Sequence, residues 1–269
     1  MASAEGYLLD NQQAEAGRRF TAMAELFDPV TIRQLSATGI GVGWCCWEVG
    51  AGGPGIATWL AARVGRTGRV LATDIDTTWL HGPFEIARHD VAADPPPPGP
   101  FDLVPARLVL VHLPARGAAV AAMLAGLRPG GWLVVEDADP ALQPLACPDE
   151  HGPDEQRANR LRVCFRTFLA QRSADLAFGR TLPRLLREAG LADVRAELFA
   201  PLSGPACRAL EDATIRQIRG RLVAAGIATD TEIDAHLAAL AAGRLDPTTA
   251  PLVSARGRAP AYALSRDTA

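Results

Sequence analysis

The sequence contains no lysine, although 27 of its 269 residues are basic. All 27 are therefore arginine. Without a lysine amine the chain cannot form a Schiff base with a carbonyl substrate or with pyridoxal phosphate. It also lacks the lysine that a phosphate-binding loop places on nucleotide phosphates. The missing residue type excludes these classes of enzyme at the outset.

Long apolar runs and grouped metal ligands are missing as well. No stretch approaches the ~20 consecutive apolar residues of a membrane-spanning helix, and the first residues lack the pattern of a secretory signal. The five cysteines show no C-x-x-C spacing, and the five histidines are scattered. We therefore expect no bound metal, reduced and buried cysteines, no membrane partner and a cytoplasmic protein.

The chain also has little net charge, because its acidic and basic residues nearly balance. The net charge of −3 provides no basic field that would hold a nucleic-acid backbone. Hydrophobic residues make up 48% of the chain, enough for a well-buried core. We expect a soluble protein whose partner is a small molecule, with no nucleic acid among its ligands.

Short apolar runs alternate with helical periodicity through the middle third of the chain. Strands are predicted at residues 44–49, 69–73, 84–89, 101–104 and 132–135, with Pro105 cutting the fourth short. Helices are predicted at 56–64 and 115–127. This alternation is typical of a parallel sheet covered by helices on both faces.

The two flanks are predicted to be mainly helical. Residues 11–38 have helical spacing, with Asp28-Pro29 closing one helix and starting another. Further helices are predicted at 154–171, 176–189, 207–225 and 231–242, and strands at 194–199 and 251–256. We expect an N-terminal cap or lid at 1–38, a core at 39–140, a helical cap at 141–192, and the last core strands with inserted helices at 193–269, all in one globular unit.

Acidic residues lie at or near the ends of four of the first five predicted strands: Glu48, Asp74, Asp90 and the pair Glu136-Asp137. Open parallel sheets bind ligands at this carboxyl edge. A glycine-rich loop at 48–55 follows the first strand and satisfies G-x-G-x-x-G, a spacing shared by dinucleotide-binding loops and by turns that bind nothing. A rim of carboxylates suits a ligand with hydroxyls and amines better than a polyphosphate.

Five motifs between Trp47 and Asp137 resemble those of class I S-adenosylmethionine-dependent methyltransferases, in the order and spacing of that family. They are E-V-G-A-G-G-P-G at 48–55, V-L-A-T-D at 70–74, H-D-V at 89–91, F-D-L-V at 101–104 and L-R-P-G-G-W-L-V-V-E-D at 127–137. The resemblance implies an α/β fold: a Rossmann-like, doubly wound, mostly parallel seven-stranded sheet with a helical cap. The chain is most similar to the small-molecule methyltransferases of actinomycete secondary metabolism.

The resemblance assigns binding of the cofactor, S-adenosyl-L-methionine, to Glu48, Gly50, Ala51, Gly52, Asp74, Ile75, Asp90, Val91 and Arg107. Glu48 and the backbone at Gly50 and Gly52 would hold the methionine portion. Asp74 would accept hydrogen bonds from the ribose hydroxyls, and Asp90 would face the adenine amino group. The product would be S-adenosyl-L-homocysteine. Arg107 begins the wall near the sulfonium.

Two side chains are candidates for catalysis. His112, after the fourth strand, could remove a proton from the acceptor, or it could brace the loop through hydrogen bonds. Tyr7 could fold over the cofactor as part of a lid, or it could be a fixed surface anchor. The acids Glu136, Asp137 and Asp139 could supply a base or bind a cationic acceptor, although solvated acids are the commoner outcome.

Two other functions remain open. An NAD-dependent oxidoreductase would use the same glycine loop, but it needs neither Glu48 nor Asp90, and the chain has no Tyr-x-x-x-Lys pair. A non-methylating cyclase or binding protein that retains S-adenosylmethionine is the second. Whether oxygen, nitrogen or carbon is methylated is left open, as is a homodimer formed through an exposed cap helix.

Overall fold

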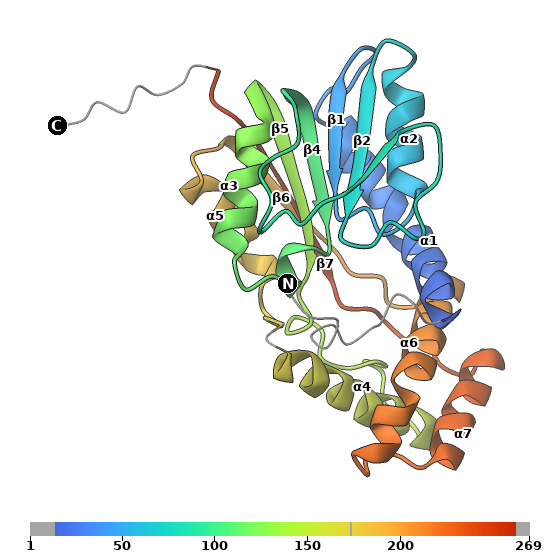
Figure 1. Ribbon diagram of the computed structural model, residues 1–269. Helices are drawn as coiled ribbons and strands as arrows, with labels where there is room; N and C mark the ends of the chain where they lie inside the picture. The colour runs from blue at the N-terminus through green and yellow to red at the C-terminus, as the bar shows by residue number, and fades with distance from the viewer. Residues whose placement is uncertain (1–13, 173, 262–269) are drawn as a thin grey trace. The chain divides into compact units, whose positions relative to one another are not determined.

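The computed structural model describes residues 14–172 and 174–261, which belong to two compact units (Figure 1). The sheet unit draws on residues 29–137, 178–198 and 253–261. The helical unit draws on residues 14–28, 138–172, 174–177 and 199–252. The division of the chain into cap and core at residues 38, 140 and 192 stays a prediction.

The sheet unit is built on a seven-stranded sheet in the order β3-β2-β1-β4-β5-β7-β6. The neighbouring pairs β1 with β2, β1 with β4, β2 with β3 and β4 with β5 are all parallel. This mostly parallel, doubly wound sheet confirms the predicted fold class. The strands are β1 (Cys45–Val49), β2 (Arg69–Asp74), β3 (Glu85–Arg88), β4 (Phe101–Arg107), β5 (Leu127–Ala138), β6 (Ala192–Phe199) and β7 (Leu252–Arg258).

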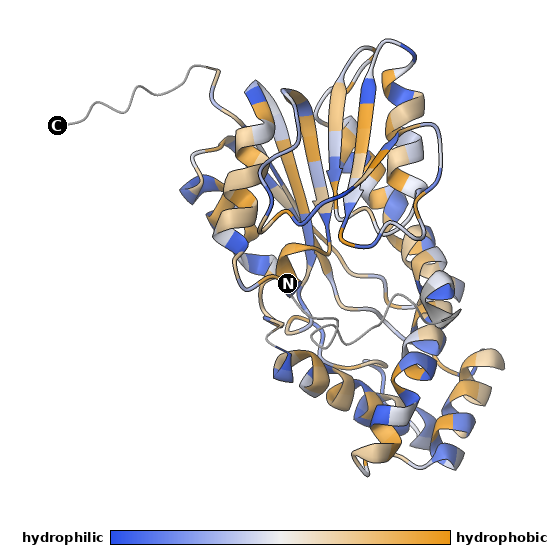
Figure 2. Ribbon diagram, viewed as in Figure 1, coloured by the Kyte–Doolittle hydropathy of each residue, from blue (hydrophilic) through white to orange (hydrophobic). Residues whose placement is uncertain are grey.

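Helices cover both faces of this sheet because successive strand residues point to opposite sides. On one face the core includes Leu35 of α1 (Ala14–Ser36) and Leu60 of α2 (Gly55–Val64). On the other it includes Met123 of α3 (Arg116–Gly126) and Leu182 of α5 (Leu182–Glu188), which follows the short 3-10 helix η2 (Gly179–Thr181). Figure 2 shows many hydrophobic residues along the central strands of the sheet, as expected where strands are buried on both faces.

Proline did not end two elements where the sequence predicts that it would. α1 runs unbroken through Pro29, and the residues Val30 and Leu35 beyond it are buried, so packing outweighs the missing backbone donor. β4 continues through Pro105 to Arg107. Pro105 keeps its pairing with Val134 of β5, whereas the recorded pairs between β4 and β1 stop at Leu103 and resume at Ala106. Both predictions of a break are wrong.

The helical unit is built from α4 (Pro153–Gln171), α6 (Pro205–Ala224) and α7 (Asp230–Ala241). Their apolar faces share a separate core with residues such as Leu161, Ile218 and Leu237. Within the described part of the chain, no helix combines the length and apolar character needed to cross a membrane.

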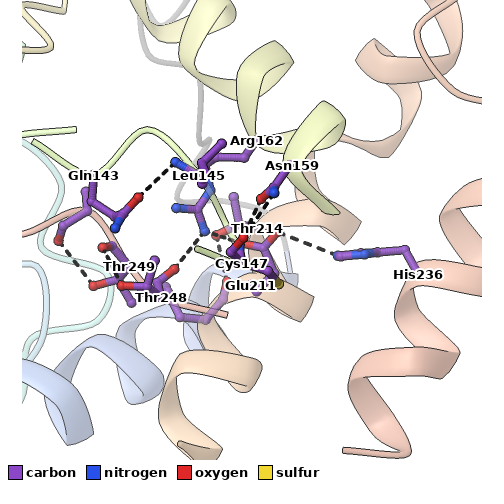
Figure 3. Close-up of polar contacts among 12 residues, drawn as sticks. Gln143, Leu145, Cys147, Asn159, Arg162, Glu211, Thr214, His236, Thr248 and Thr249 are labelled. Atoms are coloured by element: carbon purple, nitrogen blue, oxygen red, sulfur yellow. Dashed lines mark hydrogen bonds and ion pairs between the residues drawn. The ribbon is translucent and has the colours of Figure 1, made fainter. Parts of the chain in front are cut away.

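A buried polar network lies inside this second core (Figure 3). Arg162 Nη2 donates to Glu211 Oε2 at 2.7 Å and to the carbonyl oxygen of Thr248 at 2.9 Å. His236 Nε2 lies 3.6 Å from Glu211 Oε1, and the His236 side chain is fully buried. Burial by itself would raise the pKa of Glu211, but Arg162 and His236 outweigh it and lower the pKa to about 2. The network joins α4 to α6 by an ion pair and places His236 of α7 beside it, in addition to the apolar packing of the three helices.

Candidate functional site

The carboxyl ends of β1, β2 and β3 lie side by side at one edge of the sheet. The pairing of Val49 with Thr73 and of Asp74 with Arg88 sets the three strands in register. Glu48 is the second-to-last residue of β1, Asp74 is the last residue of β2, and Asp90 lies two residues after the end of β3. The strand order reverses beside β1, where β4 lies on its other side, and this is the point where such sheets bind ligands.

The loop after β1 depends on glycine at two positions. Gly50 and Gly52 both have a φ of 63°, which is in the left-handed region that a side chain disfavours. A Cβ added to Gly50 would lie 2.3 Å from Val109 Cγ2, far inside contact distance. The amide of Ala51 donates to the carbonyl oxygen of Thr73 at 3.0 Å. The loop is therefore held tightly between the end of β2 and the turn after β4.

Asp74 is anchored by the backbone on both oxygens. Its Oδ2 accepts the amide of Gly52 at 2.9 Å, and its Oδ1 accepts the amide of Asp76 at 3.0 Å. Burial raises the pKa of Asp74, and these two amides act in the opposite direction. Because each carboxylate oxygen has a second lone pair, the anchored carboxyl can still accept two hydroxyl hydrogen bonds.

A second polar group lies beneath the loop, between the sheet and α1. Arg107 Nη1 donates to Thr31 Oγ1 at 2.9 Å, and Thr31 in turn donates to Glu136 Oε2. These three residues and the buried Glu48 line a cavity of about 10 Å³. That volume is close to the space one water molecule occupies. Sequence reasoning missed Thr31, because it lies on a helix 76 residues before Arg107 in the chain.

The predicted adenine side of the site lies at the end of β2 and β3. Asp90 Oδ1 accepts the amide of Ala92 at 2.9 Å, which fixes the turn after β3. Val91 is buried, whereas 62% of the Ile75 surface is exposed. The Ile75 backbone is held in place by Arg88, whose Nε donates to its carbonyl oxygen at 3.1 Å. An exposed apolar side chain held in this way offers a surface for an aromatic ring.

The other predicted residues are distributed as follows. His112 ends the 3-10 helix η1 (Leu110–His112) and is exposed. Glu136, Asp137 and Asp139 are all almost fully buried, so the expectation of solvated acids is wrong. Tyr7 lies outside the described residues. The sheet unit thus brings nine predicted cofactor-binding residues and His112 to the carboxyl side of one sheet.

Residues 47–135 match the family model described as a methyltransferase domain. This segment of the chain is a methyltransferase domain. The resemblance carried by the five motifs is confirmed for this segment, and S-adenosylmethionine is the cofactor of such domains. No curated protein sequence matches the chain.

Three solved structures show the same fold. Phosphoethanolamine N-methyltransferase 2 of Haemonchus contortus, in complex with phosphomonomethylethanolamine and S-adenosylhomocysteine, has a TM-score of 0.58 at 16% identity over 96% of this chain and 61% of that one. The same enzyme with S-adenosyl-L-methionine gives 0.57 at 15% over 94% and 60%. The cyclase SpnF gives 0.51 at 17% over 87% and 82%.

These similarities concern the fold. At identities of 15–17% they carry no assignment of substrate. The chain spans about three fifths of the length of the two Haemonchus contortus chains that it matches.

The residues of this chain fit S-adenosylmethionine. The cofactor presents an ammonium group, two ribose hydroxyls and an adenine amino group, all of them hydrogen-bond donors. The strand ends present carboxylate acceptors at Glu48, Asp74 and Asp90, and Asp74 is preoriented by two amides. Within the described ranges, no group of three or more His, Cys, Asp or Glu side chains is arranged to hold a metal ion.

Proposed function

We propose that this chain transfers the methyl group of S-adenosyl-L-methionine to a small-molecule acceptor. The observation that carries the proposal is the row of three carboxyl groups, Glu48, Asp74 and Asp90, at the ends of three adjacent parallel strands beside a tight glycine loop. This donor set suits a nucleoside with an amino acid attached and suits a polyphosphate poorly.

Each carboxyl group has a separate role in this proposal. Asp74, held by the amides of Gly52 and Asp76, accepts the ribose hydroxyls. Asp90 and the backbone of Val91 face the adenine, and Ile75 covers its ring. Glu48 and the backbone of residues 50–52 hold the methionine end, above the polar group to which Arg107 belongs.

When bound, the cofactor supplies a methyl group on a positively charged sulfur, which leaves as part of a neutral thioether. A neutral leaving group needs no acid, so the chain's residues have to align the acceptor and exclude water. The acceptor loses a proton as it is methylated. His112 is exposed on the turn after β4 and is the candidate to receive that proton; Tyr7 remains the candidate lid residue.

We also propose that the acceptor belongs to secondary metabolism, that the protein acts in the cytoplasm, and that it forms a homodimer. The absence of a basic field supports a small, uncharged or moderately apolar acceptor over nucleic acid. Analytical ultracentrifugation of the full chain tests the dimer directly: a single monomeric species at micromolar concentration rules it out.

Calorimetric titration separates the three candidate functions. We expect saturable binding of S-adenosylmethionine and S-adenosylhomocysteine and no response to NAD. Binding of NAD alone would overturn the proposal. If the cofactor binds, incubation with candidate acceptors distinguishes transfer, which releases S-adenosylhomocysteine, from a cyclase or binding protein, which forms product or complex without it.

A further inference from the structure

The residue directly before each of the three carboxyl groups belongs to a second row of side chains: Trp47, Thr73 and His89. Because successive residues of a strand point to opposite faces, Trp47 and Thr73 point away from the carboxyl groups that follow them. Trp47 accordingly lies in the core that α3 and α5 cover. The contacts within this second row show how the ends of the three strands are held together.

The hydroxyl of Thr73 joins the end of β2 to the end of β1. Trp47 Nε1 donates to Thr73 Oγ1 at 2.8 Å, and Thr73 Oγ1 donates to the carbonyl oxygen of Glu48 at 3.1 Å. A hydroxyl can accept and donate at the same time. The carbonyl oxygen of Thr73 also accepts the amide of Ala51 at 3.0 Å. This one buried residue therefore holds both the end of β1 and the first part of the glycine loop.

The indole of Trp47 extends the row to β3. Neighbouring strands are about 4.8 Å apart, so a side chain on β1 has to cross β2 to reach the end of β3. The Trp47 ring meets the His89 ring edge to face, with centroids 5.5 Å apart and an interplanar angle of 89°. The amide of His89 donates to the carbonyl oxygen of Asp74 at 2.9 Å, and its Nε2 lies 2.9 Å from that of Pro95. His89 thus connects the end of β3 to β2 and to the loop beyond it.

The indole is itself fixed on its remaining sides. Its ring centroid lies 5.7 Å from that of Phe101, and a Cβ added to Gly126 would lie only 3.1 Å from Trp47 Cζ3. Trp47 is fully buried. A side chain packed this closely has little room to move, so its position is set by the core of the sheet unit.

We propose that Trp47 and Thr73 are positioning residues that fix the spacing of the three carboxyl groups on the opposite face of the sheet. Thr73 acts on the backbone of Glu48 and on the glycine loop, and Trp47 connects Thr73 to His89, the residue before Asp90. The spacing is a property of the ligand-free protein. Its consequence for cofactor affinity rests on the proposed function.

Hydrogen exchange on the full-length, ligand-free protein tests the spacing without any cofactor. The amide of Gly52 is bound by Asp74 and that of Ala92 by Asp90, so their exchange reports on two of the strand ends. Thr73→Val removes the hydroxyl with little change in volume, and we expect it to speed exchange of the Gly52 amide about tenfold, as for the loss of a buried hydrogen bond. Thr73→Ser keeps the hydroxyl and should exchange at a rate close to that of wild type.

Trp47→Phe tests the link to β3, because it removes the indole N–H and shortens the ring that reaches His89. We expect it to speed exchange of both the Gly52 and the Ala92 amides. Thr73→Val and Trp47→Phe remove the same hydrogen bond, so their effects on Gly52 should combine to less than their sum in the double variant. Fully additive effects would contradict the link.

Titration with S-adenosylhomocysteine completes the test. We expect Thr73→Val to weaken binding about tenfold, with Thr73→Ser and Thr38→Val close to wild type. Thr38→Val is the matched control: Thr38 is also buried and its hydroxyl donates to a carbonyl oxygen, that of Leu35 at 2.6 Å, but it lies between α1 and β1.

Three results overturn the proposal: Gly52 exchange that is unchanged in Thr73→Val, exchange that is equally fast in Thr73→Ser, or faster exchange in Thr73→Val with the affinity of wild type. If wild type itself binds no S-adenosylhomocysteine, the proposed function fails, and the exchange of the Gly52 and Ala92 amides alone decides the positioning role.

Discussion

The helical unit and the sheet unit each bury a carboxyl group, and the pKa values of the two groups move in opposite directions. Glu211 is held by Arg162 at 2.7 Å, and its pKa falls to about 2. Asp137 faces backbone amides instead, and burial raises its pKa well above the ordinary range. A guanidinium in direct contact can outweigh the cost of burial, whereas neutral amides at looser distance cannot.

The difference indicates different roles. A carboxylate fixed in a salt bridge inside an apolar core keeps one charge state over the physiological range, which suits a structural link between α4, α6 and α7. A carboxyl group with a raised pKa is sensitive to pH and to small shifts of its neighbours.

The largest effect should come from breaking the helical-unit network. We expect Glu211→Ala to lower the free energy of unfolding by about 3–5 kcal/mol, because Arg162 would stay buried without its partner. Urea unfolding followed by circular dichroism measures this. In wild type, the depressed pKa means that this stabilisation is present above pH 4.5 and is lost as the pH falls toward 2. A loss below about 1 kcal/mol would show that the salt bridge stabilises little.

The next largest effect should come from Gly50→Ala. The new Cβ would meet Val109 Cγ2 at 2.3 Å on a backbone with a φ of 63°, and strain and overpacking together should cost about 1–3 kcal/mol. Thermal unfolding measures the loss. The double variant with Val109→Ala should recover the part due to the collision but not the part due to φ. Equal stability of single and double variants would contradict the contact.

Asp74→Ala should leave the fold intact and weaken cofactor binding by about 1–3 kcal/mol, the range for leaving buried polar contacts unpaired. Calorimetric titration with S-adenosylhomocysteine measures the change. Asp76→Ala is a suitable control, because it keeps the amide that Asp74 accepts and removes only a neighbouring charge, which raises the pKa of Asp74. Unchanged affinity in Asp74→Ala would remove this residue from the site.

The smallest effect should appear in the pH dependence of Asp137→Asn, and it sharpens the comparison with Glu211. A raised folded-state pKa means that the contribution of Asp137 is complete at low pH and declines as the pH rises through that pKa. Above about pH 4, the ordinary pKa of an aspartate in an unfolded chain, the melting temperature of Asp137→Asn should therefore rise relative to that of wild type. Each kcal/mol of unfolding free energy that wild type loses corresponds to about 2–4 °C. A constant difference across the range would mean that Asp137 does not titrate there.

Much of the sheet unit could be predicted from local pattern. Four of the first five short apolar runs have an acidic residue at their end, and parallel pairing brings such residues to one edge, so Glu48, Asp74 and Asp90 could be grouped from sequence alone. The motifs around them located the glycine loop. Local pattern failed at Pro29 and Pro105, where tertiary packing outweighs the preference of a single residue.

What could not be predicted depends on contacts between distant segments. Asp137 looked like a solvated acid because nothing near it in the sequence shows which elements will cover that face of β5. Arg162 and Glu211 lie 49 residues apart on different helices, and no spacing rule connects them. Thr31 joins Arg107 and Glu136 only because α1 packs over the sheet.

The border strand β6 has a consequence for how copies of this chain meet. Nearly all of its side chains are exposed, and Asp193, Arg195 and Glu197 alternate along it, with Glu197 tied back to Arg33. Charges spaced in this way discourage one sheet from extending into the next. This edge of the sheet is thereby protected from the edge-to-edge strand addition that leads to fibrils, and any self-association of the chain should use a different surface.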